Sequence, residues 1–135
     1  MYEKICAVNS VAVHVRRGDL LGLNAPYYKF VYFKRAINYI KTQVDNPVFF
    51  FFCNKESMEW VKENLHIFNI RASDRIEFVT GNDAKNSYRD MQLMSSCKHA
   101  VITFSSFGFW GAYLIDNPNK ITCSPDVRIN TTHSF

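Results

Sequence analysis

Residues 48–53 read VFFFFC, an apolar run of six residues in which no polar side chain alternates. Its length and its aromatic and β-branched content are typical of a strand that is buried on both faces. Such a strand needs helices on both sides of its sheet, which is the arrangement of parallel α/β domains. The rest of the chain should therefore alternate strands with amphipathic helices.

The remaining sequence supplies this alternation. In residues 27–44 the apolar residues Phe30, Phe33, Ile37, Ile40 and Val44 recur at spacings of three and four, which predicts a helix. We therefore expect an α/β fold with an open, parallel, Rossmann-like sheet, helices on both faces, and ligands outside the carboxyl ends of the strands. The other strands are expected at 10–15, 75–79, 99–104 and 120–124, and the other helices at 56–65, 87–97 and 107–114.

The composition indicates one folded domain over residues 1–135. Hydrophobic residues make up 47% of the chain, and we interpret its aromatic runs, including Phe107, Phe109 and Trp110, as core. The net charge of +4 suits a small anionic ligand but is too weak and too evenly spread to indicate nucleic-acid binding. No apolar segment approaches the ~18–20 residues that span a bilayer, so we expect no membrane contact by this segment.

Four cysteines, Cys6, Cys53, Cys97 and Cys123, lie far apart in the sequence. None belongs to a C-x-x-C pair, and none has a histidine at the spacing of a metal site. We interpret all four as buried thiols, against the alternatives of a disulfide or a metal site, and we expect no metal in this domain.

Residues 14–20 read HVRRGDL and follow the apolar run SVAV of the first expected strand directly. Two adjacent guanidinium groups repel each other unless an anion lies beside them, and the planar fork of an arginine matches a phosphate group in a bidentate manner. Gly18 allows the backbone to turn sharply, and Asp19 can orient a neighbouring guanidinium. Phosphate binding and a surface loop with one salt bridge both fit these residues taken alone.

Ser105 and Ser106, in the stretch TFSSFGFW, stand where the fourth expected strand gives way to a helix. The N-terminus of a helix attracts phosphate through its dipole and its N–H groups. The alternative is that one of these serines only caps the helix. Neither G-x-G-x-x-G nor G-x-x-x-x-G-K-S/T occurs in the chain, which disfavours NAD-type dehydrogenases and P-loop NTPases.

Asp90 closes the tetrad SYRD (87–90), whose S-x-x-D spacing is typical of a capping box at the start of a helix. A carboxylate can also accept two N–H groups from the edge of a guanine base. The spacing favours the cap, and the contact with a base is the functional alternative.

Taken together, these pieces resemble a known family. The segments VAVHVRRGDL, NPVFFFFCNKESMEWVKENL and YRDMQLMSSCKHAVITFSSFGFWGAYL, in this order, are similar to galactoside alpha-1,2-fucosyltransferases of glycosyltransferase family 11. The likeness covers residues 10–124. HVRRGD recurs across inverting fucosyltransferases, whereas MEWVKEN and FGFWGAYL are more particular to the alpha-1,2 family and look closest to its animal branch.

The resemblance implies an inverting transfer of L-fucose from GDP-fucose to the 2-hydroxyl of a terminal galactose, without a metal or other cofactor. The expected partners are GDP-fucose, as a substrate, and a galactose-terminated glycan acceptor. In this family the HxRRGD motif lies well inside the chain, whereas here it begins at residue 14. We therefore expect the donor half of a two-domain GT-B enzyme, without the acceptor-side half. The animal branch implies the lumenal side of the Golgi membrane, and a bacterial origin would imply the cytoplasm.

Carried over by motif, Arg16 resembles the arginine that holds the donor diphosphate, and His14 resembles a guanine-side contact. Asp90 resembles the aspartate that reads guanine in the broader fucosyltransferase superfamily. Ser105 and Ser106 look like the turn that binds phosphate.

Arg17 and Asp19 also match the motif. The resemblance makes Arg16 and Asp19 the candidate catalytic residues: Arg16 would stabilise the charge that grows on the leaving diphosphate, and Asp19 and His14 are the candidates for the general base. Two alternatives stay open. The chain could be a nucleotide-binding fragment without catalysis, or it could come from a protein or core-glycan fucosyltransferase that shares HxRRGD.

Overall fold

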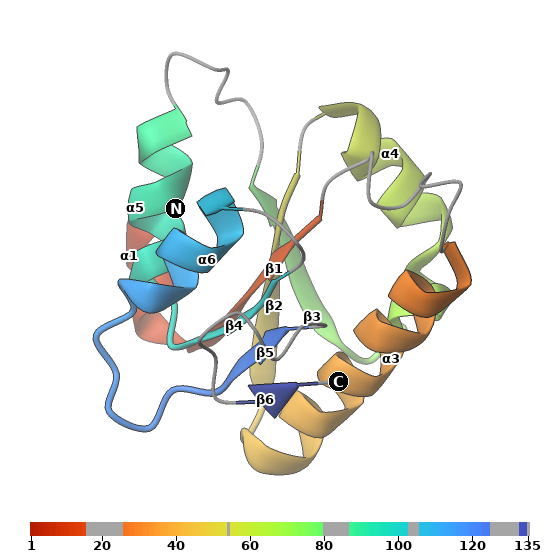
Figure 1. Cartoon of the computed structure of the whole chain (residues 1–135), viewed down its shortest axis with the longest axis horizontal. Coiled ribbons are helices and arrows are strands. Elements are labelled where there is room, and N and C mark those ends of the chain that lie inside the picture. The colour runs from red at the N-terminus through yellow and green to blue at the C-terminus, as the bar shows by residue number, and fades with distance from the viewer. Residues whose placement is uncertain (16–25, 54, 80–86, 103–105, 125–132, 135) are drawn as a thin grey trace.

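The computed structural model of this chain describes residues 1–15, 26–53, 55–79, 87–102, 106–124 and 133–134 (Figure 1). Within these residues, parallel strands form one six-stranded sheet, and helices cover both of its faces. This arrangement confirms the open, parallel, Rossmann-like α/β fold that the sequence predicts.

The strands lie in the order β3-β2-β1-β4-β5-β6, so that β1 is an interior strand. Each strand predicted from the sequence is present, although β4 and β5 are shorter than the predicted segments. The short strand β6 is an addition that the sequence pattern does not predict. The bounds are β1 Asn9–His14, β2 Pro47–Phe52, β3 Arg75–Val79, β4 His99–Val101, β5 Thr122–Ser124 and β6 His133–Ser134.

Helices α3 and α4 cover one face of the sheet, and α1, α5 and α6 cover the other (Figure 1). All four predicted helices are present. Helix α1 is not predicted, because Ile5 is its single buried residue and no apolar period can be recognised. The bounds are α1 Tyr2–Ala7, α3 Pro26–Gln43, α4 Lys55–Glu63, α5 Ser87–Ser96 and α6 Ser106–Tyr113, with a 3-10 helix η1 at Leu65–Phe68.

The four phenylalanines of β2 divide between two hydrophobic cores. Phe49 and Phe51 belong to the core beneath α3 and α4, whereas Phe50 and Phe52 belong to the core beneath α1, α5 and α6. Successive side chains of a strand point to opposite faces, so an uninterrupted apolar run suits a strand between two helical layers. Burying each ring contributes about 1.5–3 kcal/mol. The prediction of a fully buried strand is confirmed for residues 48–52, whereas Cys53 follows the strand and is partly buried.

Trp110 is an exception to the predicted aromatic core. Its side chain and that of Tyr113 are about half exposed on α6, whereas Phe107 and Phe109 pack against the core. Helix α6 carries apolar residues on all sides, and a helix on the outside of a sheet can bury only one side of itself. The prediction is therefore wrong for Trp110.

The winding of the chain reverses at β1. The chain passes from β1 through β2 to β3 and then crosses to β4, which pairs with the other edge of β1. In open parallel α/β sheets, ligands bind outside the carboxyl ends of the strands at such a switch point. His14 ends β1 and Val101 ends β4, so these two residues mark the place where a ligand is expected.

Candidate functional site

His14 lies at this switch point, and its side chain is only 8% exposed. The first turn of α6 covers it. The ring of Phe107 lies with its centroid 5.4 Å from that of the imidazole, at an interplanar angle of 37°. Gly108 lies so near that a Cβ at this position would be 2.9 Å from His14 Nδ1. Strand β1 and helix α6, which carry two separate sequence motifs, therefore meet directly.

Helix α6 begins at Ser106, the second serine of the predicted phosphate-binding turn, and Ser105 lies outside the described residues. The first N–H groups of a helix have no partner within the helix, and the helix dipole adds partial positive charge at this end. An anion at the carboxyl edge of β1 and β4 would therefore meet an electropositive helix end. The structure brings this end of α6 and His14 together.

Asp90 lies in the first turn of α5 and is partly buried. It is close to Cys53, which follows β2: burial raises the pKa of the Cys53 thiol to about 12, and the negative charge of Asp90 adds to the rise. His14 is the register partner of Phe52, the residue before Cys53. The N-terminal ends of α5 and α6 lie at the same edge of the sheet (Figure 1). This placement fits a helix cap, and it also fits a contact with a ligand at the switch point.

A close contact between α5 and α6 holds these two helices together. A Cβ at Gly111 of α6 would overlap the sulfur of Met94 in α5. Met94 is fully buried, so its side chain occupies the space that the glycine leaves. The Met94 side chain, on the helix that carries Asp90, thus packs directly against the backbone of the helix that begins at Ser106.

Four of the predicted site residues, Arg16, Arg17, Asp19 and Ser105, lie outside the described residues. Their roles stay predictions from the sequence. The last described residue before this segment is Val15, which is buried and whose backbone N–H donates to the Phe52 carbonyl oxygen at 3.0 Å. The first strand is therefore paired as far as the start of the arginine motif.

The structure adds Phe107, Gly108 and Cys53 to the candidate site. Sequence reasoning treated Phe107 as core and Cys53 as a buried thiol, and it gave Gly108 no role. A signal was present, because a glycine inside a predicted helix is unfavourable by about 1 kcal/mol relative to alanine and therefore points to a packing reason. The partner of that glycine, His14, could not be found from spacing alone.

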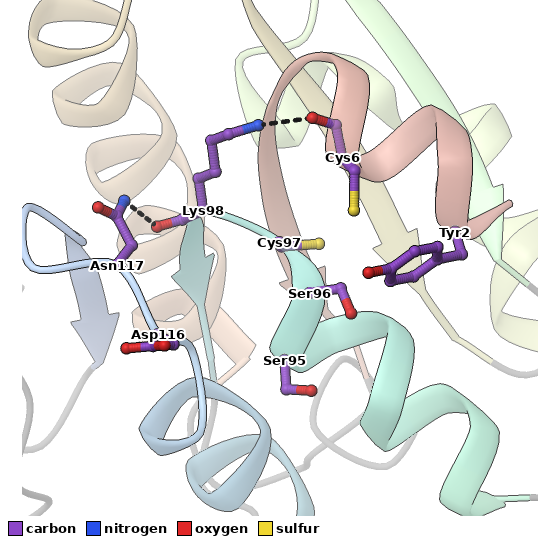
Figure 2. A pocket seen from close by; sticks show the side chains of 8 residues that line it. All are labelled: Tyr2, Cys6, Ser95, Ser96, Cys97, Lys98, Asp116 and Asn117. Atoms are coloured by element: carbon purple, nitrogen blue, oxygen red, sulfur yellow. Dashed lines mark hydrogen bonds between the residues drawn. The ribbon is translucent and has the colours of Figure 1, made fainter.

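A separate hollow of about 380 Å³ lies away from these residues, around the C-terminal end of α5 and the start of β4 (Figure 2). The Lys98 ammonium group beside it donates to the carbonyl oxygens of Cys6 and Val8, and Asn117 Nδ2 donates to the Lys98 carbonyl oxygen at 3.0 Å. Lys98 therefore links α1 to the sheet. The lining residues are Tyr2, Cys6, Ser95, Ser96, Cys97, Lys98, Asp116 and Asn117, and none is a predicted site residue.

The four cysteines are free thiols, but they are not all buried. Cys97 and Cys123 are buried as predicted, Cys53 is partly buried, and Cys6 is exposed. The prediction is wrong for Cys6 because it lies on α1, which turns only Ile5 toward the core.

Among the residues that the structure describes, no group of three or more histidine, cysteine, aspartate or glutamate side chains is placed to hold a metal ion. Over the same residues, no helix is both long enough and apolar enough to cross a membrane.

An open parallel sheet with its candidate residues at a topological switch point is the arrangement of nucleotide-binding α/β domains. The family model for glycosyl transferase family 11 matches residues 3–126. The chain belongs to this family, which confirms the resemblance seen in the motifs.

Curated relatives come from both bacteria and animals. An alpha-1,2-colitosyltransferase of Escherichia coli is 37% identical over 129 residues, which are 91% of this chain and 42% of that protein. Galactoside alpha-(1,2)-fucosyltransferase 1 of Homo sapiens is 33% identical over 109 residues, which are 77% of this chain and 28% of that protein. The chain thus spans less than half the length of these relatives. No solved structure matches it. The assignments to the animal branch and to the Golgi stay predictions.

Proposed function

We propose that this chain binds the nucleotide-sugar donor of a galactoside alpha-1,2-fucosyltransferase, which transfers L-fucose from GDP-fucose to the 2-hydroxyl of a terminal galactose. The observation that carries the proposal is that family 11 spans residues 3–126. Its motif HVRRGD begins at the carboxyl end of β1, where the open sheet has its switch point. The chain would then be the donor half of a two-domain enzyme.

The donor diphosphate would lie between the arginine motif and the N-terminal end of α6. An inverting displacement at the anomeric carbon places negative charge on the leaving diphosphate. Arg16 would neutralise this charge through a bidentate contact, and the N–H groups near Ser105 and Ser106 would add fixed partial positive charge. Such preorganised donors lower the barrier because they need no reorientation while the charge develops.

The guanine base would lie toward α5. The carboxylate of Asp90 would accept hydrogen bonds from two N–H groups of guanine, which adenine does not offer in the same pattern. The position of Asp90 near Cys53, at the end of β2, supports this assignment because it lies at the same sheet edge as His14.

The general base for the acceptor hydroxyl would be Asp19 or a residue outside this chain. His14 was the other candidate, but its imidazole is 8% exposed and lies beneath Phe107 and Gly108. A general base must come within hydrogen-bonding reach of the proton that it removes. An imidazole buried at this position would have to become accessible before it could reach an acceptor hydroxyl, which favours Asp19 over His14.

The identity of the transferred sugar has a second candidate. The name of the E. coli relative specifies transfer of colitose, and the name of the human relative specifies transfer of fucose, whereas both names specify an alpha-1,2 linkage. Competition of each nucleotide-activated sugar against GDP binding would distinguish them. We expect GDP-fucose to compete more strongly, and stronger competition by nucleotide-activated colitose would reassign the donor.

Binding to GDP tests the nucleotide site. Isothermal titration calorimetry on the folded chain should show binding of GDP, with ADP weaker by about tenfold or more, the worth of one hydrogen bond to a charged group. No heat of binding for GDP by a chain with a cooperative thermal transition would contradict the proposal.

Turnover tests the assignment to the donor half. Positioning of the acceptor can be worth ~7–11 kcal/mol of the barrier, and the family resemblance places that task in the other half. We therefore expect GDP release from GDP-fucose to be negligible, with or without lactose as a galactoside acceptor. Robust lactose-dependent release by these 135 residues would show that the donor-half assignment is wrong. GDP binding without any turnover in a longer chain that includes an acceptor half would favour the alternative of a non-catalytic nucleotide-binding protein.

A further inference from the structure

The imidazole of His14 fills the space between the end of β1 and the first turn of α6. Its ring centroid is 5.4 Å from that of Phe107, and the two planes are tilted by 37°. A side chain at the next position, Gly108, would bring its Cβ to 2.9 Å from His14 Nδ1 and to 3.6 Å from His14 Cγ. Nitrogen and carbon atoms that are not bonded rarely approach this closely, so there is no room for a side chain at position 108. The Gly108 backbone therefore packs directly against the imidazole ring.

The same Cβ would lie 3.5 Å from Ile102 Cβ, just beyond the end of β4. The first turn of α6 therefore packs against two residues at the ends of neighbouring strands, His14 of β1 and Ile102 after β4. Both are buried, and buried side chains in packed cores have little room to shift. The size of the His14 ring thus sets how far the first turn of α6 stands from the sheet edge.

We propose that His14 is a positioning residue for the phosphate end of the donor site and makes no direct contact with the nucleotide. This inference rests on the proposed function, because it assumes that the N-terminal end of α6 faces the donor diphosphate. The ring would hold the N–H groups at the start of α6 at the distance at which they can donate to phosphate oxygens. Hydrogen bonds weaken steeply with distance and angle, so a small displacement of this turn would lower phosphate affinity.

The inference differs from the role that the motif resemblance suggested for His14, a contact on the guanine side. The two roles predict different losses of ligand affinity when the His14 contact is disturbed. A contact with guanine contributes to the binding of guanosine and of GDP alike, whereas a positioned helix end contributes only when phosphate is present. The ratio of the affinity for GDP to the affinity for guanosine therefore distinguishes them.

The first variant is Gly108→Ala, which should push the first turn of α6 away from His14. We expect affinity for GDP to fall by about tenfold or more, with affinity for guanosine within about threefold of the wild type. Gly111→Ala is the matched control on the same helix, because its Cβ would meet Met94 of α5 instead of His14. This control should lower the melting temperature while changing the ratio of GDP to guanosine affinity by less than about threefold.

The second variant removes the obstacle. In His14→Ala/Gly108→Ala the alanine at position 108 enters the space that the imidazole leaves, so the first turn should return toward its place. We expect GDP affinity to recover by about threefold or more relative to Gly108→Ala. If His14 binds the nucleotide itself, the double variant will bind GDP no better than Gly108→Ala, and that outcome would overturn the inference.

A third variant decides the matter if Gly108→Ala does not fold. Phe107→Leu loosens the packing on the imidazole without adding atoms near the backbone. We expect it to lower GDP affinity while leaving guanosine affinity unchanged, and equal losses for both ligands would contradict a positioning role. Failure of the wild-type chain to bind GDP at all would count against the proposed function. If the wild type binds GDP and Gly108→Ala leaves the ratio of GDP to guanosine affinity unchanged, only the positioning role of His14 is contradicted.

Discussion

The hydroxyl of Tyr32 in α3 lies 2.5 Å from the carbonyl oxygen of Ile102 and 2.8 Å from that of Cys123. Tyr32 is fully buried, and its one hydroxyl hydrogen serves two carbonyl groups at the carboxyl ends of β4 and β5. The Ile102 N–H donates in turn to the Cys123 carbonyl oxygen at 3.0 Å. A helix on one face of the sheet thereby fixes the strand end from which α6 departs on the other face.

Replacement of Tyr32 by phenylalanine should therefore destabilise the fold. The change leaves the ring in place but removes the donor from buried carbonyl groups, so the free energy of unfolding should fall by about 1–3 kcal/mol. Urea unfolding followed by circular dichroism measures this quantity. The control is Tyr113→Phe on the exposed side of α6, which should change it by less than about 0.5 kcal/mol. Equal effects from the two variants would show that the Tyr32 hydrogen bonds carry no net stability.

Arg16→Lys should weaken GDP binding while keeping the charge. A lysine cannot reproduce the planar fork of the guanidinium group, so we expect a loss of roughly 1.5–3 kcal/mol in calorimetric titrations. Arg35→Lys, at an exposed position of α3, is the control and should bind GDP as the wild type does. Equal affinities of Arg16→Lys and the wild type would mean that Arg16 does not contact the diphosphate.

Asp90→Asn tests the recognition of guanine. The amide retains some capping ability but places a donor opposite the N–H groups of the base, so the preference for GDP over ADP should shrink by about tenfold. The melting temperature should change little. Asp116→Asn, at an exposed position after α6, should alter neither quantity. A large drop in melting temperature with an intact preference would make Asp90 a helix cap only.

The free energy of unfolding should fall at acidic pH because of the ion pair between Lys41 and Asp74, whose Nζ and Oδ2 atoms are 2.6 Å apart. Burial opposes ionisation of Asp74, but the hydrogen bonds from Lys41 and from the Arg71 backbone N–H, together with the positive charges of both residues, outweigh it and lower the pKa of this carboxyl. A lowered pKa in the folded state stabilises the fold above the ordinary aspartate pKa of 3.8, and this stabilisation is lost as pH falls through the folded-state value.

The stability difference between the wild type and Asp74→Asn should therefore be full at pH 7 and should shrink below about pH 4. Urea unfolding at pH 7, 5 and 3 gives this difference. The exposed Asp45→Asn is the control and should show no such dependence. A difference that stays constant down to pH 3 would mean that the ionised form of Asp74 is not the stabilising one.

The thiols should differ sharply in reactivity. Burial raises the pKa of Cys97 and of Cys123 to about 12, so at pH 8 only about one in ten thousand of each is the reactive thiolate. Cys53 also has a pKa of about 12, whereas Cys6 is exposed. A disulfide-exchange reagent should titrate one thiol quickly in the native chain, and Cys6→Ser should abolish that phase. Two or more fast thiols would contradict the observed burial.

The layers of the fold can be predicted from the sequence because its strongest patterns are uninterrupted ones. The run VFFFFC requires helices on both faces, and the alternation along the chain supplies them. Helix α1 and strand β6 are not predictable in this way, because one buried Ile5 and two strand residues leave no period. Cys6 was misassigned for the same reason, since its burial depends on a helix that the pattern does not reveal.

The sequence predicts a site residue only where a side chain with suitable chemistry also stands at or just after the end of an expected strand. His14 was singled out at the end of a strand and Ser106 after another strand, and the switch point brings them to one edge. The packing of Gly108 against His14 was not predictable, since the two residues are distant in sequence and glycine carries no side chain to suggest a partner. Contacts of this kind depend on the packing of α6 over the sheet.

The interior position of β1 has a consequence for how the chain acquires its structure. The Lys98 backbone N–H donates to the Ser10 carbonyl oxygen at 2.9 Å, and 88 residues separate the two. At typical rates of synthesis, roughly 4 to 18 seconds pass between the appearance of these two residues. During this interval β1 can pair with β2 but has an open edge where β4 belongs, and unpaired strand edges invite association with other chains. Nascent chains of this protein should therefore depend on chaperones until β4 has emerged.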